Sequence, residues 1–268
     1  MTTRKMVFTD TSLCTACKAC SVACKAWNDL PAEKTQLIKG YQSQGNFTPT
    51  TWTYMSLHEK YENGKMNWLF FKHQCFHCAD PACMKVCPVG AISKTAESGY
   101  TLIDQEKCIG CGYCTIACPW GVPKTDPEKK KTSKCTGCID RVENGILPAC
   151  AQTCQPGAIQ FGEHAEMLAK AKARLEEVKK TNPKAQLYGD NLMGGTTYIY
   201  LLMDSPETYG LPVNPSASAS LSLWQDYVQP YGGWLIPLAA AASVGSFFTT
   251  RVLKVMDSKS KGGDTHGA

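Results

Sequence analysis

Cysteine is the residue type whose spacing most clearly indicates chemistry here, because all sixteen cysteines of the 268-residue chain fall into four related groups. Each group begins with C-x2-C and ends with C-x3-C. The groups are Cys14, Cys17, Cys20 and Cys24; Cys75, Cys78, Cys83 and Cys87; Cys108, Cys111, Cys114 and Cys118; and Cys135, Cys138, Cys150 and Cys154. Three closely spaced thiolates can bind one iron–sulfur cube, and the fourth cysteine is directed to a neighbouring cube. At four thiolates per cube, the chain is predicted to bind four [4Fe–4S] clusters and to transfer electrons.

Zinc sites and disulfides are the competing interpretations of these cysteines. Zinc sites also use four cysteines, but as two separated C-x2-C pairs and not as three close cysteines followed by a fourth. Disulfides require an oxidising compartment, and they leave the repeated spacing unexplained. Because the pattern occurs four times, we favour iron–sulfur clusters over both alternatives.

The separation between the groups predicts which cysteines share a cluster. The second and third groups are separated only by residues 88–107, as in a compact ferredoxin in which two motifs exchange their fourth ligands. By elimination, the first and fourth groups pair across the chain. The predicted ligand sets are Cys14, Cys17, Cys20 and Cys154 (site I); Cys24, Cys135, Cys138 and Cys150 (site II); Cys75, Cys78, Cys83 and Cys118 (site III); and Cys87, Cys108, Cys111 and Cys114 (site IV). The predicted fold class is α+β, with one ferredoxin-like module nested within another.

Two further elements are predicted from the residue pattern around these motifs. Residues 52–57 and 66–72 read as a β-hairpin whose turn contains Asn63 and Gly64. Residues 163–180 have the apolar spacing of an amphipathic helix. The lysine- and proline-rich stretch 124–134 is expected to be a loop that leads into the fourth motif.

Some residues close to the cysteines are candidates for adjusting a cluster's reduction potential. His77, beside Cys78, is a candidate hydrogen-bond donor to a cluster sulfur, with an ordinary loop histidine as the alternative. Trp120 is a candidate shield against solvent. Lysines near the motifs could offset the negative charge of the clusters, although solvated surface lysines are the simpler interpretation. These lysines are Lys18, Lys25, Lys85, Lys107 and Lys134.

The C-terminal region contains a long segment without charge. No charged residue occurs from 227 to 250, and residues 234–250 are mostly apolar, as expected of a single transmembrane helix of about 20 residues. Small residues recur at the spacing that allows close packing on another membrane helix, at Ala241/Gly245 and Ala242/Ser246. A buried helix of a soluble domain is the alternative.

The charges around this segment predict its orientation. Lysine and arginine residues follow it, so the positive-inside rule places the C-terminus in the cytoplasm and the cluster domain on the periplasmic side. Residues 1–10 contain no apolar signal peptide, yet clusters are built in the cytoplasm. We therefore expect export of the folded chain with a partner that carries a twin-arginine signal.

These observations predict the domain organisation. Residues 1–160 form the nested modules, with the inner module at 75–118; residues 161–226 form an amphipathic helix and a partner-contacting region; residues 227–254 form the membrane helix; and residues 255–268 form a cytoplasmic tail. The formal charge of +5 omits the negative charge of thiolate-bound clusters, so it does not indicate nucleic-acid binding.

No phosphate-binding glycine loop and no nucleophile with its base are recognisable, so we expect no catalytic residue and no enzyme activity from this chain alone.

Several segments resemble a known family. The run CFHCADPACMKVCP resembles the four-cluster electron-transfer subunits of molybdopterin oxidoreductases. HAEMLAKAKARLEEVKK, LYG, GGTTYIYLL and YGLPVNP are similar to the β subunit of membrane-bound respiratory formate dehydrogenase. The resemblance implies a molybdenum or tungsten bis-pterin catalytic subunit that oxidises formate. It also implies a membrane cytochrome b subunit that receives the electrons and reduces quinone.

Two alternative functions stay open at this point. The chain could serve a periplasmic hydrogenase, or a reductase of dimethyl sulfoxide, polysulfide or tetrathionate. It could also be a free-standing polyferredoxin without a fixed complex. The apolar segment near the C-terminus argues against the polyferredoxin and against the reductases, whose subunits of this kind generally lack it.

Overall fold

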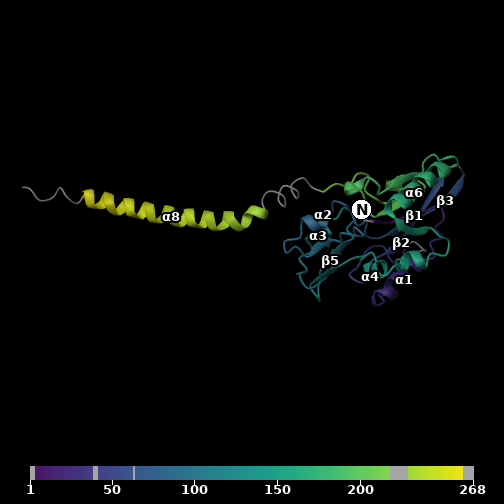
Figure 1. Cartoon of the computed structure of the whole chain (residues 1–268), viewed down its shortest axis with the longest axis horizontal. Helices are drawn as coiled ribbons and strands as arrows, with labels where there is room; N and C mark the ends of the chain where they lie inside the picture. Colours follow the sequence, from purple (N-terminus) through teal and green to yellow (C-terminus); the bar gives the residue numbers. More distant parts are fainter. Residues whose placement is uncertain (1–3, 39–41, 63, 218–228, 262–268) are drawn as a thin grey trace, which may run out of the picture. The chain divides into compact units, whose positions relative to one another are not determined.

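The computed structural model describes residues 4–38, 42–62, 64–217 and 229–261, in two compact units (Figure 1). One unit is Met1–Ser218, which contains every cysteine, and the other is Ala219–Ala268. The domain boundaries expected after residues 160, 226 and 254 stay predictions.

A four-stranded mixed sheet is the largest β element of the first unit. Its strands are β8 (Ile159–Glu163), β1 (Lys5–Asp10), β10 (Tyr198–Leu202) and β9 (Gln186–Tyr188), in that spatial order. Strand β1 is parallel to β10 and antiparallel to β8, while β9 is antiparallel to β10. The sheet therefore joins the beginning of the chain to the segment that follows the fourth cysteine motif.

The two faces of this sheet have different neighbours because side chains alternate along each strand. Met6 and Phe8 of β1 pack in one hydrophobic cluster with helix α6 (His164–Lys179), whereas Val7 packs in another, which contains cysteines of the motifs. Helix α6 buries Met167, Ala171 and Val178. The amphipathic helix predicted over 163–180 is thus confirmed, and it covers the sheet face opposite the cysteines.

The insertion between the first two motifs ends in the predicted hairpin. Strands β2 (Tyr54–Glu62) and β3 (Lys65–His73) pair antiparallel from Tyr54↔His73 to Glu62↔Lys65. Strand β2 begins two residues later than predicted, both strands extend further toward the turn, and Asn63 of the expected turn lies outside the described residues. The half of the hairpin near Tyr54 and His73 is packed into the core, while its distal half is largely exposed.

Short elements separate the cysteine motifs. They are α1 (Ala19–Trp27), α2 (Ala82–Lys85), β4 (Ile92–Lys94), β5 (Thr101–Ile103), α3 (Tyr113–Ala117), β6 (Lys124–Asp126), β7 (Lys131–Ser133), α4 (Ile139–Glu143) and α5 (Ala149–Gln152). Two 3₁₀ turns, η1 (Leu192–Gly194) and η2 (Pro206–Tyr209), flank β10.

The prediction of a loop over 124–134 is wrong, because this stretch forms the hairpin β6–β7. Its turn is held by Asp126, whose Oδ1 accepts hydrogen bonds from the backbone N–H groups of Glu128 and Lys129. A hydrogen bond between the Thr125 and Thr132 hydroxyls, 2.8 Å long, links the strands. The turn chemistry of the aspartate outweighs the poor strand propensity of the lysines.

The second unit contains the long helix α8 (Gln229–Lys261), which continues through Pro237. Within the described ranges, no helix combines the length and the apolar character needed to cross a membrane. The transmembrane helix expected over 227–254 is therefore not confirmed.

Candidate iron–sulfur sites

The pairing of β1 with β8 brings the first and fourth cysteine motifs together. Strand β1 leads into Cys14, and the segment after Cys154 leads into β8. The backbone N–H of Asp10 donates to the carbonyl of Ala158, with 2.8 Å between the atoms. Because the two strands are antiparallel, the first motif leaves the sheet at the end where the fourth arrives. Helices α1 and α5 of these motifs are also in contact.

The pair β4–β5 repeats this arrangement for the second and third motifs. Strand β4 follows Cys87, and β5 leads into Cys108. The backbone N–H of Asp104, four residues before Cys108, donates to the carbonyl of Ala91 at 2.8 Å. The sequences CPVGAI at 87–92 and CQPGAI at 154–159 occupy equivalent positions. The molecule thus contains two similar modules, and the outer one is closed by strands from the two ends of the cysteine region.

In both modules a backbone N–H also donates to the fourth cysteine of a motif, although the donor is four residues after that cysteine in one module and five in the other. The backbone N–H of Ala91 donates to Cys87 Sγ, and that of Ile159 donates to Cys154 Sγ, each at 3.3 Å. Hydrogen bonds to ligand sulfurs are among the interactions that tune an iron–sulfur cluster.

The cysteines of sites I and IV each line one cavity. The first cavity is lined by Cys14, Cys17, Cys20 and Cys154. The second is lined by Cys87, Cys108, Cys111 and Cys114. The cysteines predicted to share each of these sites therefore face a common space, although Cys154 is distant in sequence from the first motif.

The cysteines within site II, and those within site III, lie close enough to one another to interact electrostatically. Burial raises the pKa of Cys24 and of Cys78, and neighbouring thiolates raise both further. The neighbours of Cys24 are Cys135, Cys150 and Cys138; those of Cys78 are Cys75, Cys118 and Cys83. These are again the residues predicted to share a site.

The four sets follow one another in a row. Burial raises the pKa of Cys20 to about 11 and that of Cys83 and of Cys135 to about 12, and each of these thiols also interacts with a cysteine of the next set. The linking pairs are Cys20 with Cys150, Cys135 with Cys75, and Cys83 with Cys114. The order is therefore I, II, III, IV, which the spacing of the motifs could not provide.

Exposure differs between the ends and the middle of this row. Only Cys17 and Cys111 are exposed among the sixteen cysteines, all of which lie in the described residues. Cys17 belongs to site I and Cys111 to site IV. The two end sites reach the surface through an exposed cysteine, whereas the cysteines of sites II and III are buried or half-buried.

Tight backbone turns shape the motif loops. Gly110 (φ +68°) lies between Cys108 and Cys111, and a Cβ there would lie 2.3 Å from the backbone oxygen of Lys130. Gly137 (φ +70°) lies between Cys135 and Cys138, and its backbone N–H donates to Cys135 Sγ at 3.4 Å. Glycine is required at Gly110 both for the positive φ and for the close approach of another backbone segment.

Buried donors without partners test whether these sites fit iron–sulfur clusters. Within the described residues, Lys72 Nζ, Gln74 Nε2 and His77 Nε2 are buried and make no hydrogen bond. All three lie close to cysteine motifs, and an acceptor such as a cluster sulfide would satisfy such donors. No three His, Cys, Asp or Glu side chains of the described ranges converge as a single metal ion requires. The sixteen thiols, together with these three unpartnered donors, fit iron–sulfur clusters.

Lys72 is a site residue that the sequence analysis missed. It is 2% exposed and lines the cavity of site I with Phe70, two residues earlier on β3. Burial acts to lower the pKa of Lys72, but the thiolates of Cys150, Cys20 and Cys135 and the Tyr200 phenol together raise it above its ordinary value. The sequence points only to lysines beside cysteines, whereas Lys72 is placed in the site by the register of β3, which the structure shows.

His77 contacts a cysteine sulfur through its backbone. Its N–H donates to Cys75 Sγ at 3.4 Å, while ring atom Nδ1 accepts from the backbone N–H of Thr101 at 3.0 Å. Burial holds the pKa of His77 well below its usual range, so the ring is neutral with its proton on Nε2. The donation from the ring to a cluster sulfur stays a prediction.

Trp120 packs beside site III. Its ring stacks on Phe76, with 4.3 Å between centroids, and its Nε1 donates to the Tyr188 hydroxyl at 2.9 Å. It also packs against the hydrophobic cluster that contains Cys75 and Cys135. This position is compatible with the expected shielding role.

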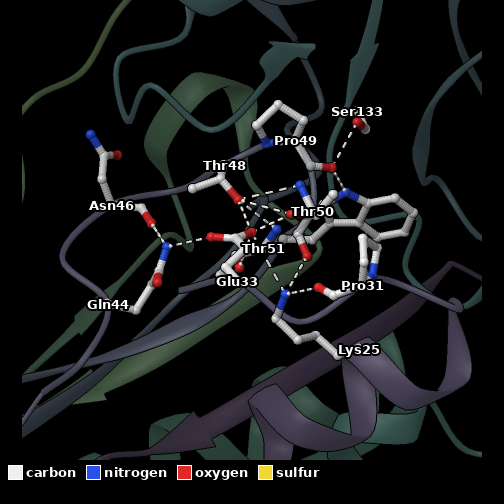
Figure 2. A network of polar contacts seen from close by, with 11 residues as sticks. Lys25, Pro31, Glu33, Gln44, Asn46, Thr48, Pro49, Thr50, Thr51 and Ser133 are labelled. Carbon is white, nitrogen blue, oxygen red and sulfur yellow. Dashed lines mark hydrogen bonds and ion pairs between the residues drawn. The ribbon is translucent and has the colours of Figure 1, made fainter. Parts of the chain in front are cut away.

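A polar network fixes the insertion beside site II (Figure 2). The Glu33 carboxylate accepts hydrogen bonds from three threonine hydroxyls and lies 3.6 Å from Lys25 Nζ. The threonines are Thr48, Thr50 and Thr51. Lys25 follows Cys24, and Ser133, which donates to the carbonyl of Pro49 at 3.0 Å, lies two residues before Cys135. The network therefore connects the insertion to two segments that carry site II cysteines.

Comparisons with known proteins agree with this arrangement. Two family models, both described as a 4Fe-4S dicluster domain, match residues 13–91 and 66–164. The chain is 42% identical over 243 residues to the iron–sulfur subunit of the nitrate-inducible formate dehydrogenase of Escherichia coli (strain K12), covering 89% of this chain and 80% of that protein.

Two other relatives are similar. The formate dehydrogenase iron–sulfur subunit of Haemophilus influenzae is 39% identical over 246 residues, covering 90% of this chain and 78% of that protein. Formate dehydrogenase 2 subunit beta (cytochrome c-553) of Nitratidesulfovibrio vulgaris is 36% identical over 213 residues, covering 76% of this chain and 96% of that protein.

Proposed function

Because the chain belongs to the family of formate dehydrogenase iron–sulfur subunits, we propose that it carries electrons from a formate-oxidising catalytic subunit to an acceptor through four [4Fe–4S] clusters. The chain is a non-catalytic electron-transfer subunit of an oxidoreductase complex. Bound clusters supply one-electron carriers; the protein supplies the thiolate ligands, their spacing and their surroundings.

The observation that carries this proposal is the row of four cysteine sets with exposed cysteines only at its ends. Cys17 and Cys111 are the exposed members, in sites I and IV. An electron can enter at one end and leave at the other, while the cysteines of the two middle sites are buried or half-buried. A surface carrier with a single redox site would need no such row.

The test uses the complex isolated anaerobically from native membranes. We expect the large subunit to contain a molybdenum or tungsten bis-pterin centre, and formate to reduce the iron–sulfur clusters of this chain. Electron paramagnetic resonance before and after formate addition measures that reduction. A complex in which formate leaves every cluster of this chain oxidised, or a large subunit that oxidises hydrogen, would contradict the proposal.

We assign the cysteine ligands as the four sets defined above. The assignment is supported by the shared cavities of sites I and IV and by the electrostatic contacts within sites II and III. In this assignment, motifs exchange their fourth ligands: Cys154 binds the same cluster as Cys14, and Cys87 binds the same cluster as Cys108.

Replacing these fourth cysteines tests the exchange. Cys154→Ser should alter the spectrum of the cluster held by Cys14, Cys17 and Cys20, and Cys87→Ser that of the cluster held by Cys108, Cys111 and Cys114. Matched substitutions Cys14→Ser and Cys108→Ser identify the two spectra. If Cys154→Ser reproduced instead the spectrum of Cys135→Ser, each motif would bind its own cluster and the assignment would be wrong.

We further propose a membrane acceptor, with α8 as the attachment. Residues 227–250 contain no charge, and three hydroxyls in α8 bond to carbonyls four residues earlier. These hydroxyls belong to Ser243, Thr249 and Thr250, and such bonds satisfy polar groups that face lipid. Ala241 and Gly245, four residues apart on α8, would pack against a cytochrome b subunit that reduces quinone.

Truncation after Gln225 tests this attachment, and a reporter fused at the N-terminus tests the proposed periplasmic orientation of the cluster domain. The complex should keep its clusters and its formate-to-dye activity, but leave the membrane and lose most quinone reduction. Continued sedimentation with membranes and full quinone reduction would exclude α8 as the attachment. A reporter at the N-terminus that is active in the cytoplasm instead of the periplasm would reverse the orientation.

A c-type cytochrome is the second candidate acceptor. It is favoured by the similarity to a formate dehydrogenase subunit whose name includes cytochrome c-553. If the truncated complex reduced such a cytochrome at the full rate while the intact complex failed to reduce quinone, this acceptor would replace the membrane one.

A further inference from the structure

We propose that the Lys72 ammonium group is a built-in cation shared by sites I and II, which raises the reduction potentials of the clusters bound there. The inference rests on the proposed function, because it requires clusters in these two sites. It assigns a role to a residue outside the cysteine motifs, three positions before Cys75.

The strand geometry directs Lys72 into the cysteine region. Lys72 lies opposite Met55 in the register of β2 and β3. Alternate residues Phe70 and Lys72 line the site I cavity, whereas Phe71 between them packs on Tyr200, with 4.5 Å between the ring centroids. The Tyr200 hydroxyl donates to the backbone carbonyl of Lys72 at 3.0 Å. Tyr200 therefore holds β3 in position from the opposite face of the strand, and the Lys72 side chain extends toward the cysteines of site I.

The ammonium group lacks the partners that other lysines in this region have. Lys134 Nζ donates to the carbonyls of Thr101 and Cys135, and Lys131 Nζ to the carbonyls of Gln105 and Cys108. Lys72 Nζ is buried and makes no hydrogen bond to any residue that the structure describes. An isolated buried charge of this kind is costly unless an anion lies beside it.

Lys72 lies beside cysteines of two sites. It lines one cavity with Cys14, Cys20 and Cys154 of site I, and Cys150 of site II packs in the same hydrophobic cluster as Cys20. The electrostatic neighbours of the ammonium group are Cys20 of site I and Cys150 and Cys135 of site II. It therefore interacts with both sets from one position. A cluster bound by either set carries negative charge from its thiolates and sulfides, which would supply the missing counter-charge and the missing acceptors.

The consequence concerns one-electron transfer without any proton. When site I or II accepts one electron, its negative charge increases by one, while Lys72 keeps its charge and its N–H bonds. A fixed positive charge in a site of low dielectric stabilises the more negative state. Hydrogen bonds and net charge near the sulfurs are established controls of cluster potential. Lys72 thus holds electrons more firmly at the I–II end of the row.

Redox titration of the intact complex, followed by electron paramagnetic resonance, tests this role. Lys72→Met removes the charge and keeps an unbranched side chain. We expect two of the four clusters to shift to more negative potentials and the other two to keep theirs. Lys72→Arg, which retains the charge, should show a smaller shift of these two potentials than Lys72→Met. The matched control is Lys65→Met, an exposed lysine on the same strand, which should shift none.

Iron and sulfide contents measured on the same samples separate the possible outcomes. Full content with unshifted potentials in Lys72→Met, or with four equal shifts, would overturn the inference alone. A packing role would lower the cluster content or the melting temperature without moving two potentials selectively. Wild-type protein with far fewer than about 16 iron atoms per chain would overturn the proposed function and this inference with it.

If Lys72→Met fails to assemble, wild-type protein labelled with ε-¹⁵N-lysine decides the question. Pulsed resonance of the reduced clusters should then detect a lysine nitrogen at two of them, assigned to sites I and II by the Cys154→Ser and Cys24→Ser spectra. The absence of nitrogen coupling at both of these sites would overturn the proposal.

Discussion

Single residues outside the cysteine motifs determine how firmly the sites are held, and Glu33 is the clearest example. Its carboxylate accepts from Thr48, Thr50 and Thr51 and lies near Lys25. Burial alone would raise the pKa of Glu33, but the three hydroxyls and Lys25 outweigh that effect and lower it. This stabilisation is therefore fully present above the ordinary pKa of 4.5 and is lost as the pH falls through and below that value.

Glu33→Gln should loosen the insertion, because the neutral amide accepts weaker hydrogen bonds than the carboxylate. We expect the local opening free energy to fall by about 1–2 kcal/mol. Hydrogen exchange at the amides of Thr50 and Thr51 measures this change in samples that retain their iron. Protection in the wild type should also decline below pH 4.5, and the variant should lack that decline. The exposed Glu128→Gln is the control; equal effects of the two substitutions would show that the network has no special role.

The cysteine residues could be predicted from the sequence, whereas Lys72 and Glu33 could not. Cysteine spacing reports local ligand geometry directly, because three thiolates of each set lie within a few residues or one short insertion. The environment of Lys72 is created by cysteines from motifs far away in the chain. Nothing in the sequence around position 72 distinguishes its ammonium group from that of an exposed lysine on the same strand.

At the scale of elements, two antiparallel strand pairs perform the same task. Strands β1 and β8 close the outer module, and β4 and β5 close the inner one, each with a 2.8 Å backbone hydrogen bond before the first cysteine of a motif. The hairpin β2–β3 and helix α6 were predictable because their patterns are local. The four-stranded sheet was not, since its strands are short and Lys5 pairs with Glu163 across most of the chain.

Two glycines of similar backbone conformation test how closely these elements pack. Gly110→Ala places a Cβ 2.3 Å from the backbone oxygen of Lys130, whereas at Gly90 no atom lies within 4 Å. Both have positive φ, +68° and +61°, so both substitutions incur a conformational cost of about 1–2 kcal/mol. Only Gly110→Ala must also displace the β6–β7 turn, and we expect it to lose the site IV cluster and several degrees of melting temperature. Iron content and thermal unfolding measure this; equal losses in both variants would contradict the packing explanation.

At the scale of the whole molecule, the four cysteine sets form one ordered row. Their order depends on contacts between motifs, such as Cys135 with Cys75, and therefore could not be inferred from spacing within a motif. The pairing of motifs could be inferred, because it follows from the separation between them. The row, the exposure of its two end sites and the membership of the formate dehydrogenase iron–sulfur family together describe a subunit that transfers electrons between partners.

Iron and acid-labile sulfide analysis of the anaerobically purified chain tests this account most directly. Four [4Fe–4S] clusters predict about 16 iron and about 16 sulfide per chain, with no stoichiometric zinc. The sixteen cysteines provide ligands for that number and leave none over. Reproducible values near half of this, or one zinc for each set of four cysteines, would contradict the four-cluster relay.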